Sequence, residues 1–443
     1  MQLKENFLKT KLGVYLPFLI LAFCLWYLAY SFDQDDFFNI LPFYTLAFAA
    51  WIFVMRADLR INQILWMGIL LRLGLIGSFP SLSDDIYRFF WDGTLIIQGL
   101  SPYGILPSDV VSLGIPNLDQ TLYNQLNSPS YYTIYPPINQ LYFALGSIAK
   151  NISLANVIMK CLIILTEVIG YIFIIKILKQ NGLKPILSSL YFLNPLVIIE
   201  GSGNLHFEVV MIPFLCISIY YVFNNKLIYG ALWMAISIGV KLLPLMILPY
   251  FWFNMGKKDR NVFFGSLILF CTLIFLPLIT SIGGTSFMSS VDLYFRKFEF
   301  NASIYYLFRY IGQQISGYNL IQYLGPSLAM ITFGINLYLA SSKNKYSFSH
   351  FVRYALFSWS IYLLLATTVH PWYVITILFF SIFTDIKYPS IWTYLIFISY
   401  VNYSYPKYYE NLWWIFLEYT FLIIWIFIEY KYSFSNIKER DTV

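Results

Sequence analysis

The stretch LGVYLPFLILAFCLWYLAY, residues Leu12 to Tyr30, decides the fold class because it is apolar throughout and carries no charge. A helix needs about 20 such residues to cross the hydrocarbon layer of a bilayer. Lys4, Lys9 and Lys11 precede the stretch, which is long and lacks a small-residue cleavage site. We therefore expect an uncleaved signal anchor that keeps the amino terminus in the cytoplasm.

The rest of the chain continues this apolar pattern. Of its 443 residues, 59% are hydrophobic and 11% are charged, and the mean hydropathy is +0.66. These values exclude a soluble globular domain. The net charge of +6 comes from short basic clusters between apolar runs, which argues against nucleic-acid binding. The composition predicts a single integral membrane domain over residues 1–443, all-α and polytopic.

Lysines and arginines cluster between apolar runs, and the positive-inside rule assigns most of the 28 to the cytoplasm. The pattern predicts a multi-pass plasma (inner) membrane protein of about 12 to 14 transmembrane helices with both termini cytoplasmic. A third helix at about 63–79 should lead into an outer loop, residues 80–150, that carries juxtamembrane helices. Residues 282–317 should form a second outer loop. Short segments are expected to be broken or re-entrant: 228–240, 243–255, 372–384 and 389–402.

Unusual polar residues gather on the non-cytoplasmic side of this topology. They comprise Asp84-Asp85, Glu200 to Glu208, Lys241, Arg296 to Asn301 and His370. Ionisable groups near membrane depth are costly and tend to mark a site, whereas a purely structural protein would scatter them. We therefore predict one functional site on the outer, or periplasmic, face.

Asp84 and Asp85 follow the expected end of the third helix. Adjacent like charges raise the pKa of at least one carboxyl group, which suits a general base that takes a proton from a hydroxyl group. A bound cation or a polar helix end are the alternatives. Aromatic, cationic and acidic side chains follow within two helical turns, in a mixture typical of sugar binding: Tyr87, Arg88, Trp91 and Asp92.

Three further regions carry candidate ligand-binding groups. Between Asn194 and Glu208, glycines and polar residues including His206 interrupt the apolar spans, which helix packing does not require. Lys241 is a lone cation in an apolar run and must pair, snorkel or meet an anion such as phosphate. Arg296 is a second outer cation, with lipid anchoring as the alternative, and His370 lies in an outer turn. The spacing of histidines and cysteines predicts no metal site, although a cation with oxygen ligands from Glu200, Glu208 and the aspartates stays an alternative.

The order of several motifs resembles that of bacterial integral membrane mannosyltransferases of the GT-C fold, which depend on polyprenol-phosphate-mannose. The resemblance covers about two thirds of the chain. The motifs are Asp84 to Gly93 (DDIYRFFWDG), Gly99 to Tyr103 (GLSPY), Tyr135-Pro136-Pro137 with Gln140, Asn194 to His206, Lys241 before Pro244, and Phe298 to Asn301.

The resemblance implies a GT-C-like bundle that works as an inverting, sugar-nucleotide-independent transferase. Asp85 or Asp84 would take a proton from the acceptor hydroxyl group as polyprenyl phosphate leaves. Cations would bind the donor phosphate: Lys241, Arg296 and Arg88. The sugar and acceptor pocket would contain Tyr87, Trp91, Asp92, Tyr103, Asn204, His206, Asn301 and His370. The implied partners are a lipid-linked sugar donor, a lipid or glycan acceptor and membrane lipids, without a cofactor or metal.

A lipid-linked oligosaccharide flippase is the alternative from another class, because it also needs a polar cavity, cations and many helices. Such a transporter needs polar groups near the midplane that serve both faces, commonly in repeated halves, and the sequence predicts neither. A ligase or polymerase of surface polysaccharide is close in chemistry, but it should carry a long outer loop late in the chain. The acceptor, the carrier length and the oligomeric state stay open at this point.

Overall fold

The computed structural model describes residues 11–279, 283–342, 346–406 and 409–440. Within these ranges the regular structure is helical, apart from one isolated bridge between Phe300 and Thr368. Apolar runs form helices because a helix satisfies its own backbone N–H and C=O groups, as a hydrocarbon layer requires. The prediction of an all-α membrane protein is confirmed.

Six helices of the described ranges are long and apolar enough to cross a membrane. They are α2 (Lys11–Ser31), α3 (Phe37–Met55), α9 (Ile152–Gln180), α15 (Lys257–Ile279), α18 (Ile321–Ser341) and α22 (Leu412–Arg440). A seventh span arises if Pro185–Phe192 and Pro195–Gly203, which meet at 57°, are counted as one broken helix. That pair contains η1 (Pro185–Ser188), α10 (Ser189–Phe192), α11 (Pro195–Ile198) and η2 (Ile199–Gly203). The expected total of 12 to 14 spans stays a prediction.

Shorter helices fill the bundle between these spans. They are α4 (Ile61–Leu73), α12 (Glu208–Phe223), α13 (Leu227–Val240), η3 (Leu243–Ile247), α14 (Leu248–Asn254), α19 (Phe348–Leu365), η4 (Pro371–Tyr373), α20 (Val374–Ser381), α21 (Tyr388–Leu395) and η5 (Ile396–Ser404). The four segments predicted to be short coincide with elements of this group. Three of the four contain both α-helix and 3₁₀-helix, and that they are broken or re-entrant stays a prediction.

The third helix of the sequence prediction ends earlier than expected. Helix α4 stops at Leu73 and not near residue 79, and Gly74 forms its C-cap. Gly77 and Pro80 lie in the following segment, and a proline disfavours helical backbone in the residue before it. Residues 74–83 therefore form turns and irregular backbone that lead from α4 to the Asp84-Asp85 pair.

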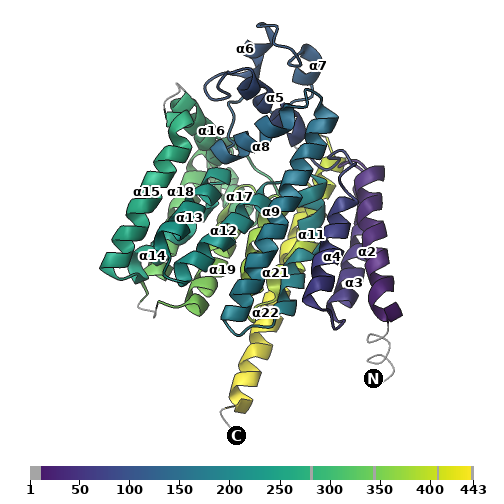
Figure 1. Cartoon of the computed structure of the whole chain (residues 1–443), viewed down its shortest axis with the longest axis vertical. Helices are drawn as coiled ribbons and strands as arrows, with labels where there is room; N and C mark the ends of the chain where they lie inside the picture. Colours follow the sequence, from purple (N-terminus) through teal and green to yellow (C-terminus); the bar gives the residue numbers. More distant parts are fainter. Residues whose placement is uncertain (1–10, 280–282, 343–345, 407–408, 441–443) are drawn as a thin grey trace.

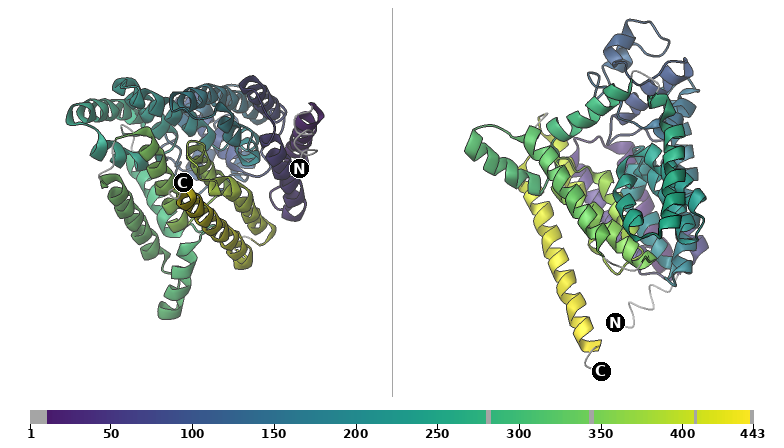
Figure 2. Two further views of the ribbon diagram at one scale, coloured as in Figure 1. Left: turned by 90° about the horizontal axis from the view of Figure 1, so that it is seen from below. Right: turned by 90° about the vertical axis from the view of Figure 1, so that its left-hand side faces the viewer.

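One end of the bundle carries a separate group of short helices, and we call it the upper end (Figure 1). This group contains α5 (Asp85–Ile97), α6 (Pro107–Val111), α7 (Gln120–Tyr123) and α8 (Pro137–Ser147). Helices α16 (Gly283–Lys297) and α17 (Ile304–Ser316) connect α15 to α18. The start of α2 and the end of α22 lie at the opposite, lower end, and α22 runs along one edge of the bundle (Figure 2). Residues 80–150 thus contain short helices, as the sequence predicts.

Helix α5 is held close to α8, and this contact fixes the direction in which its first residues point. A Cβ atom at Gly93 would lie 2.2 Å from the carbonyl oxygen of Phe143, so only glycine allows this approach. One helical turn away, the rings of Phe89 and Phe143 stack with centroids 4.3 Å apart. Helix α8 packs in turn on the central helix α9.

Candidate active site

Asp84 and Asp85 lie at the amino-terminal end of α5, where the helix dipole favours negative charge. The Asp85 carboxylate accepts a hydrogen bond from Asn127 Nδ2 at 2.7 Å, and the Tyr135 hydroxyl group hydrogen-bonds to the same carboxylate. Asp84 is more open and hydrogen-bonds to Gln34. Loss of solvation, together with the charge of Asp85, raises the pKa of Asp84. Asp85 is therefore the less exposed member of the pair, and its role as a base stays a prediction.

Arg88 and Asp92 form a buried ion pair that organises the upper end. Arg88 Nε lies 2.9 Å from Asp92 Oδ1, and Arg88 Nη1 donates to the carbonyl oxygens of Ser128 at 3.2 Å and Tyr131 at 3.0 Å. Gln140 Nε2 donates to the second Asp92 oxygen at 2.9 Å. These bonds attach the segment before α8 to α5, so the described contacts of Arg88 are with the protein itself.

The predicted aromatic residues of the upper end differ in their surroundings. Trp91 is buried beside Tyr123, with ring centroids 6.3 Å apart. Tyr103 is buried too, and its hydroxyl group donates to the carbonyl oxygen of Tyr135 at 3.0 Å. Tyr87 is only partly buried and lies near the charge of Asp84. Trp91 and Tyr103 thus pack inside the group of short helices at the upper end, while Tyr87 borders the acidic pair.

Asn204 connects a second part of the chain to the acidic pair. It follows the π-helical turn η2, and its Oδ1 accepts a hydrogen bond from the backbone N–H of Leu82 at 3.0 Å. Its Nδ2 donates to the carbonyl oxygen of Ile199 at 2.9 Å. Leu82 lies two residues before Asp84, so Asn204 fixes the backbone that leads into α5.

Glu200, within the same π-helical turn, lies among polar side chains in the protein interior. Its Oε2 is 3.0 Å from His206 Nδ1, and its Oε1 accepts a hydrogen bond from the Tyr400 hydroxyl group at 2.7 Å. His206 is only 3% exposed, and its Nε2 has no hydrogen-bond partner among the described residues. Buried polar atoms are normally paired, so this nitrogen is suited to a polar ligand.

Four rings from distant parts of the sequence form one stack. Trp372 lies between His206, with centroids 3.5 Å apart, and His370, at 4.5 Å. Phe300 stacks on the other side of His370 at 4.7 Å. The isolated bridge between Phe300 and Thr368 keeps Phe300 beside the segment that carries His370. The stack brings His206 and His370 together, as the sequence analysis expected.

Lys241 lies beside this stack and pairs with Glu208. Their side chains form an ion pair between the C-cap of α13 and the first residue of α12; Glu208 is fully buried, whereas the Lys241 side chain is 22% exposed. The Lys241 ammonium group also lies 5.3 Å from the centre of the Tyr373 ring. An ammonium group has three donors, and one bond to Glu208 leaves capacity for an anion.

Tyr403 lies beside the ring stack, and sequence reasoning missed it. Its ring lies 5.7 Å from that of Tyr400, whose hydroxyl group hydrogen-bonds to Glu200. The Tyr403 ring lies 5.5 Å from that of Phe300. The tyrosine-rich run at 400–405 was the available signal, but an aromatic run at the end of an apolar segment resembles a membrane-interface belt.

Asn301 anchors the segment that carries Phe300. Its backbone adopts a positive φ of 47°, its N–H donates to Glu410 Oε1 at 3.1 Å, and its Nδ2 donates to Glu418 Oε2 at 3.0 Å. The Tyr419 hydroxyl group donates to the Asn301 carbonyl oxygen at 2.8 Å. Asn301 thus positions the ring stack from the side of α22.

Glu410 makes this anchor sensitive to pH. Burial raises the pKa of Glu410 to about 7, above its ordinary value of 4.5. The folded state then binds the proton more tightly than the unfolded state, so stability is greatest below about pH 4.5 and falls as the pH rises through about 7. We expect Glu410→Gln to flatten this decline in thermal midpoint in detergent between about pH 5 and 8. The surface control Asp109→Asn should show the same decline as wild type. An equally steep decline in Glu410→Gln would contradict the assignment.

Arg296 differs from the other predicted phosphate-binding residues. It lies on α16 and pairs with Asp292, Nε to Oδ1 at 2.7 Å, and both side chains are about half exposed or more, at 46% and 60%. Its Nη1 also reaches the carbonyl oxygen of Gln322. The described contacts therefore place Arg296 on the surface of α16 and do not join it to the ring stack.

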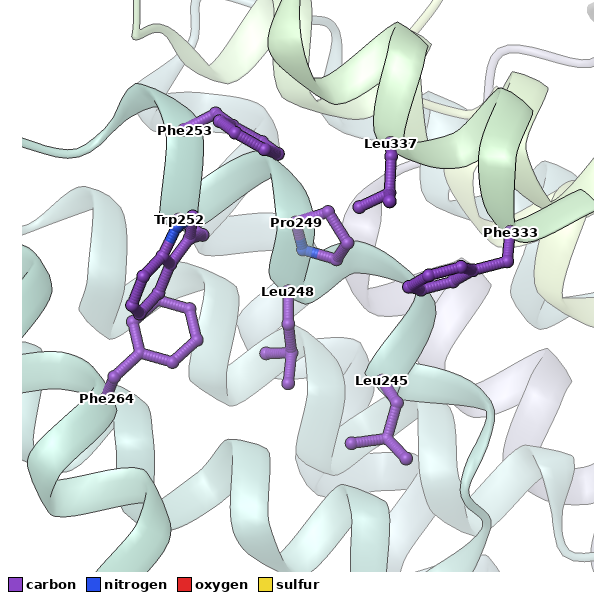
Figure 3. Close-up of a pocket in the computed structure, with 8 residues that line it drawn as sticks. All are labelled: Leu245, Leu248, Pro249, Trp252, Phe253, Phe264, Phe333 and Leu337. Atoms are coloured by element: carbon purple, nitrogen blue, oxygen red, sulfur yellow. The ribbon is translucent and has the colours of Figure 1, made fainter. Parts of the chain in front are cut away.

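An apolar hollow of about 360 Å³ lies between η3, α14, α15 and α18 (Figure 3). Leu248, Pro249 and Phe333 are typical of its lining, and none of its eight lining residues is charged. It suits hydrocarbon and not a sugar. Among the described residues there is also no group of three or more His, Cys, Asp or Glu that could hold a metal. Metal independence stays a prediction.

Comparisons with known proteins agree with the motif order. Residues 40–256 match the family model of the alpha-(1->6)-mannopyranosyltransferase N-terminal domain. Alpha-(1->6)-mannopyranosyltransferase A of Corynebacterium glutamicum is 23% identical over 188 residues, which is 41% of this chain and 36% of that protein. The Mycobacterium tuberculosis protein of the same name is 25% identical over 227 residues, 49% of this chain and 40% of that protein.

A eukaryotic relative also matches. GPI mannosyltransferase 1 of Candida albicans is 26% identical over 178 residues, 37% of this chain and 44% of that protein. The chain therefore spans less than half the length of each of these relatives, and no solved structure matches it significantly. The matched family segment contains the acidic pair, His206 and Lys241 but not the later ring-stack residues. Over residues 40–256, the chain is similar to membrane mannosyltransferases, in agreement with the resemblance of its motifs.

Proposed function

We propose that the protein transfers a hexose, with mannose as the first candidate, from a polyprenyl-phosphate donor to a lipid or glycan acceptor. Three relatives of the chain are named as mannosyltransferases. The observation that carries the proposal is the Asp84-Asp85 pair at the amino-terminal end of α5, where Asp85 accepts a hydrogen bond from Asn127. The backbone that leads into this pair is bound by Asn204, which follows the turn that carries Glu200.

Asp85 is the general base in this proposal. Its carboxylate takes the proton of the acceptor hydroxyl group while that oxygen forms a bond to the anomeric carbon. The bond from this carbon to the phosphate oxygen breaks, and the lipid phosphate leaves with the electron pair. Attack opposite to the leaving group inverts the configuration. Asn127 and Tyr135 orient Asp85, and Asp84 is a second carboxylate beside it.

Lys241 is the first choice for stabilising the departing phosphate, because it is partly open and lies beside the ring stack. His206 Nε2 offers a further polar contact from the buried side. Arg88 is occupied by Asp92 and backbone carbonyl groups, and Arg296 lies with Asp292 on α16. We therefore give these two arginines a smaller part in phosphate binding than the sequence alone suggested.

The reaction takes place on the non-cytoplasmic face in this proposal. The distribution of basic residues supports cytoplasmic termini in the plasma membrane. The start of α2 and the end of α22 lie at the lower end, opposite α5 to α7 (Figure 1). The acidic pair belongs to α5, so the same orientation brings it to the outer face, where a lipid-linked donor is accessible.

The proposal is tested with purified protein in liposomes that contain polyprenyl-phosphate-mannose and a panel of lipid and glycan acceptors. We expect a glycosidic product with this donor, none with a sugar nucleotide, and no loss of transfer with a chelator. Movement of the lipid-linked sugar between leaflets without product would favour a flippase. Product formed from the sugar nucleotide alone would overturn the proposed donor.

A further inference from the structure

Lys160 is a fully buried lysine in the first third of α9, and the proposed chemistry does not use it. Its ammonium group donates to the carbonyl oxygen of Leu75 at 2.9 Å, to the carbonyl oxygen of Ser78 at 2.6 Å and to Ser78 Oγ at 2.8 Å. A lysine has three donors, so all are satisfied by this one turn. Among the described residues it forms no ion pair with a carboxylate.

The turn that Lys160 binds follows the end of α4. Leu75 and Ser78 lie beyond the C-cap Gly74, and the Leu75 carbonyl oxygen also accepts hydrogen bonds from the backbone N–H and the hydroxyl group of Ser78. Asn156, one turn earlier on α9, donates from Nδ2 to the same Ser78 carbonyl oxygen at 2.8 Å. Two residues of α9 therefore hold one peptide group.

The same segment continues directly to the acidic pair. Ser78 is six residues before Asp84, and the backbone N–H of Leu82 is bound by Asn204. Residues 78–82 are thus held at one end by α9 and at the other by the residue that follows η2. We propose that Lys160 and Asn156 are positioning residues, which set the place of Asp84 and Asp85 through residues 75–83; this inference rests on the proposed function.

The packing of α4 on α9 has its own polar contact. Arg72 and Glu167 form a fully buried ion pair of 2.7 Å, and Arg72 also donates to the carbonyl oxygen of Phe192 at 2.9 Å. This pair holds the helices about two turns further along α9. Burial of the Lys160 ammonium group costs free energy as well, and the packing of α4 on α9 does not require it. Its hydrogen bonds to the segment beyond α4 give this burial a role.

The test compares Lys160→Met with Lys176→Met, which removes a lysine from the exposed lower part of the same helix. We expect Lys160→Met to lower kcat by about 10- to 100-fold with a KM for the donor within about twofold of wild type. Lys176→Met should change neither value. Two milder variants cover the case in which Lys160→Met does not fold. Asn156→Leu removes one donor to the Ser78 carbonyl oxygen, and Ser78→Ala removes one acceptor of Lys160. Both variants should fold and give smaller losses of kcat.

A second readout is independent of catalysis. Ser81→Cys places a thiol group in the held segment, and its labelling rate with a membrane-impermeant maleimide is measured against the native cysteines. We expect faster labelling in the Lys160→Met and Asn156→Leu backgrounds than with Lys176→Met. Unchanged labelling would overturn the positioning role, whatever the activity. An inactive wild-type protein that still shows the labelling difference would overturn the proposed function alone.

Discussion

Replacing Asp85 with asparagine is expected to lower kcat by about 10²- to 10⁴-fold, the usual contribution of a general base. The amide keeps the size of the side chain and can still meet Asn127 and Tyr135, but it cannot accept the acceptor proton. The KM for the donor should stay close to that of wild type, because the proposed role lies in the transition state. Initial rates with purified protein measure both values.

Two controls make this result specific. Asp84→Asn removes the more open carboxylate of the pair and should cost less activity than Asp85→Asn. Asp109→Asn changes an exposed carboxylate on α6 and should leave kcat unchanged. Equal activity of wild type, Asp85→Asn and the double variant Asp84→Asn/Asp85→Asn would remove the proposed base. Loss in Asp84→Asn alone would transfer the role to Asp84.

Replacing Lys241 with methionine should destabilise the protein and impair transfer. Glu208 is fully buried, so loss of its partner leaves an uncompensated carboxylate, at a cost of about 3–5 kcal/mol. The double variant Lys241→Met/Glu208→Leu removes both charges, and its stability should return close to that of wild type. Its transfer rate should remain low, because no cation replaces Lys241 at the donor phosphate.

This comparison separates binding from folding. Thermal midpoints in detergent measure the stability of each variant, and donor titrations measure kcat and KM. Recovery of both stability and activity in the double variant would assign Lys241 a purely structural role. A single variant as stable as wild type would show that the pair does not contribute as its burial suggests.

The sequence predicted an all-helical membrane protein, because apolar length is a local property, whereas the expected 12 to 14 spans stay a prediction beside the six long apolar helices of the described residues. It also predicted the resemblance to mannosyltransferases, and the structure brings His206 and His370 to one ring stack, while the roles of the site residues stay predictions. It placed the end of the third helix too late, since Gly74 and Gly77 lie in an apolar run that looks continuous. A local pattern shows that a run is apolar but not where tertiary contacts stop the helix.

The sequence does not predict which residues far apart in the chain contact each other. Lys241 was recognised as an unusual cation, but Glu208 as its partner follows from the packing of α12 on α13. Tyr403 contacts the ring stack from the late part of the chain. Lys160 was overlooked inside a long apolar span, although an isolated lysine there was a signal in itself.

The sidedness of the upper end tests the account most directly. Gln120→Cys places a thiol group on the exposed surface of α7, in the group of helices that carries Asp85. Labelling with a membrane-impermeant maleimide is compared in intact and permeabilised cells. The account predicts full labelling in intact cells. Labelling only after permeabilisation would place the carboxylates in the cytoplasm and contradict transfer at the outer face.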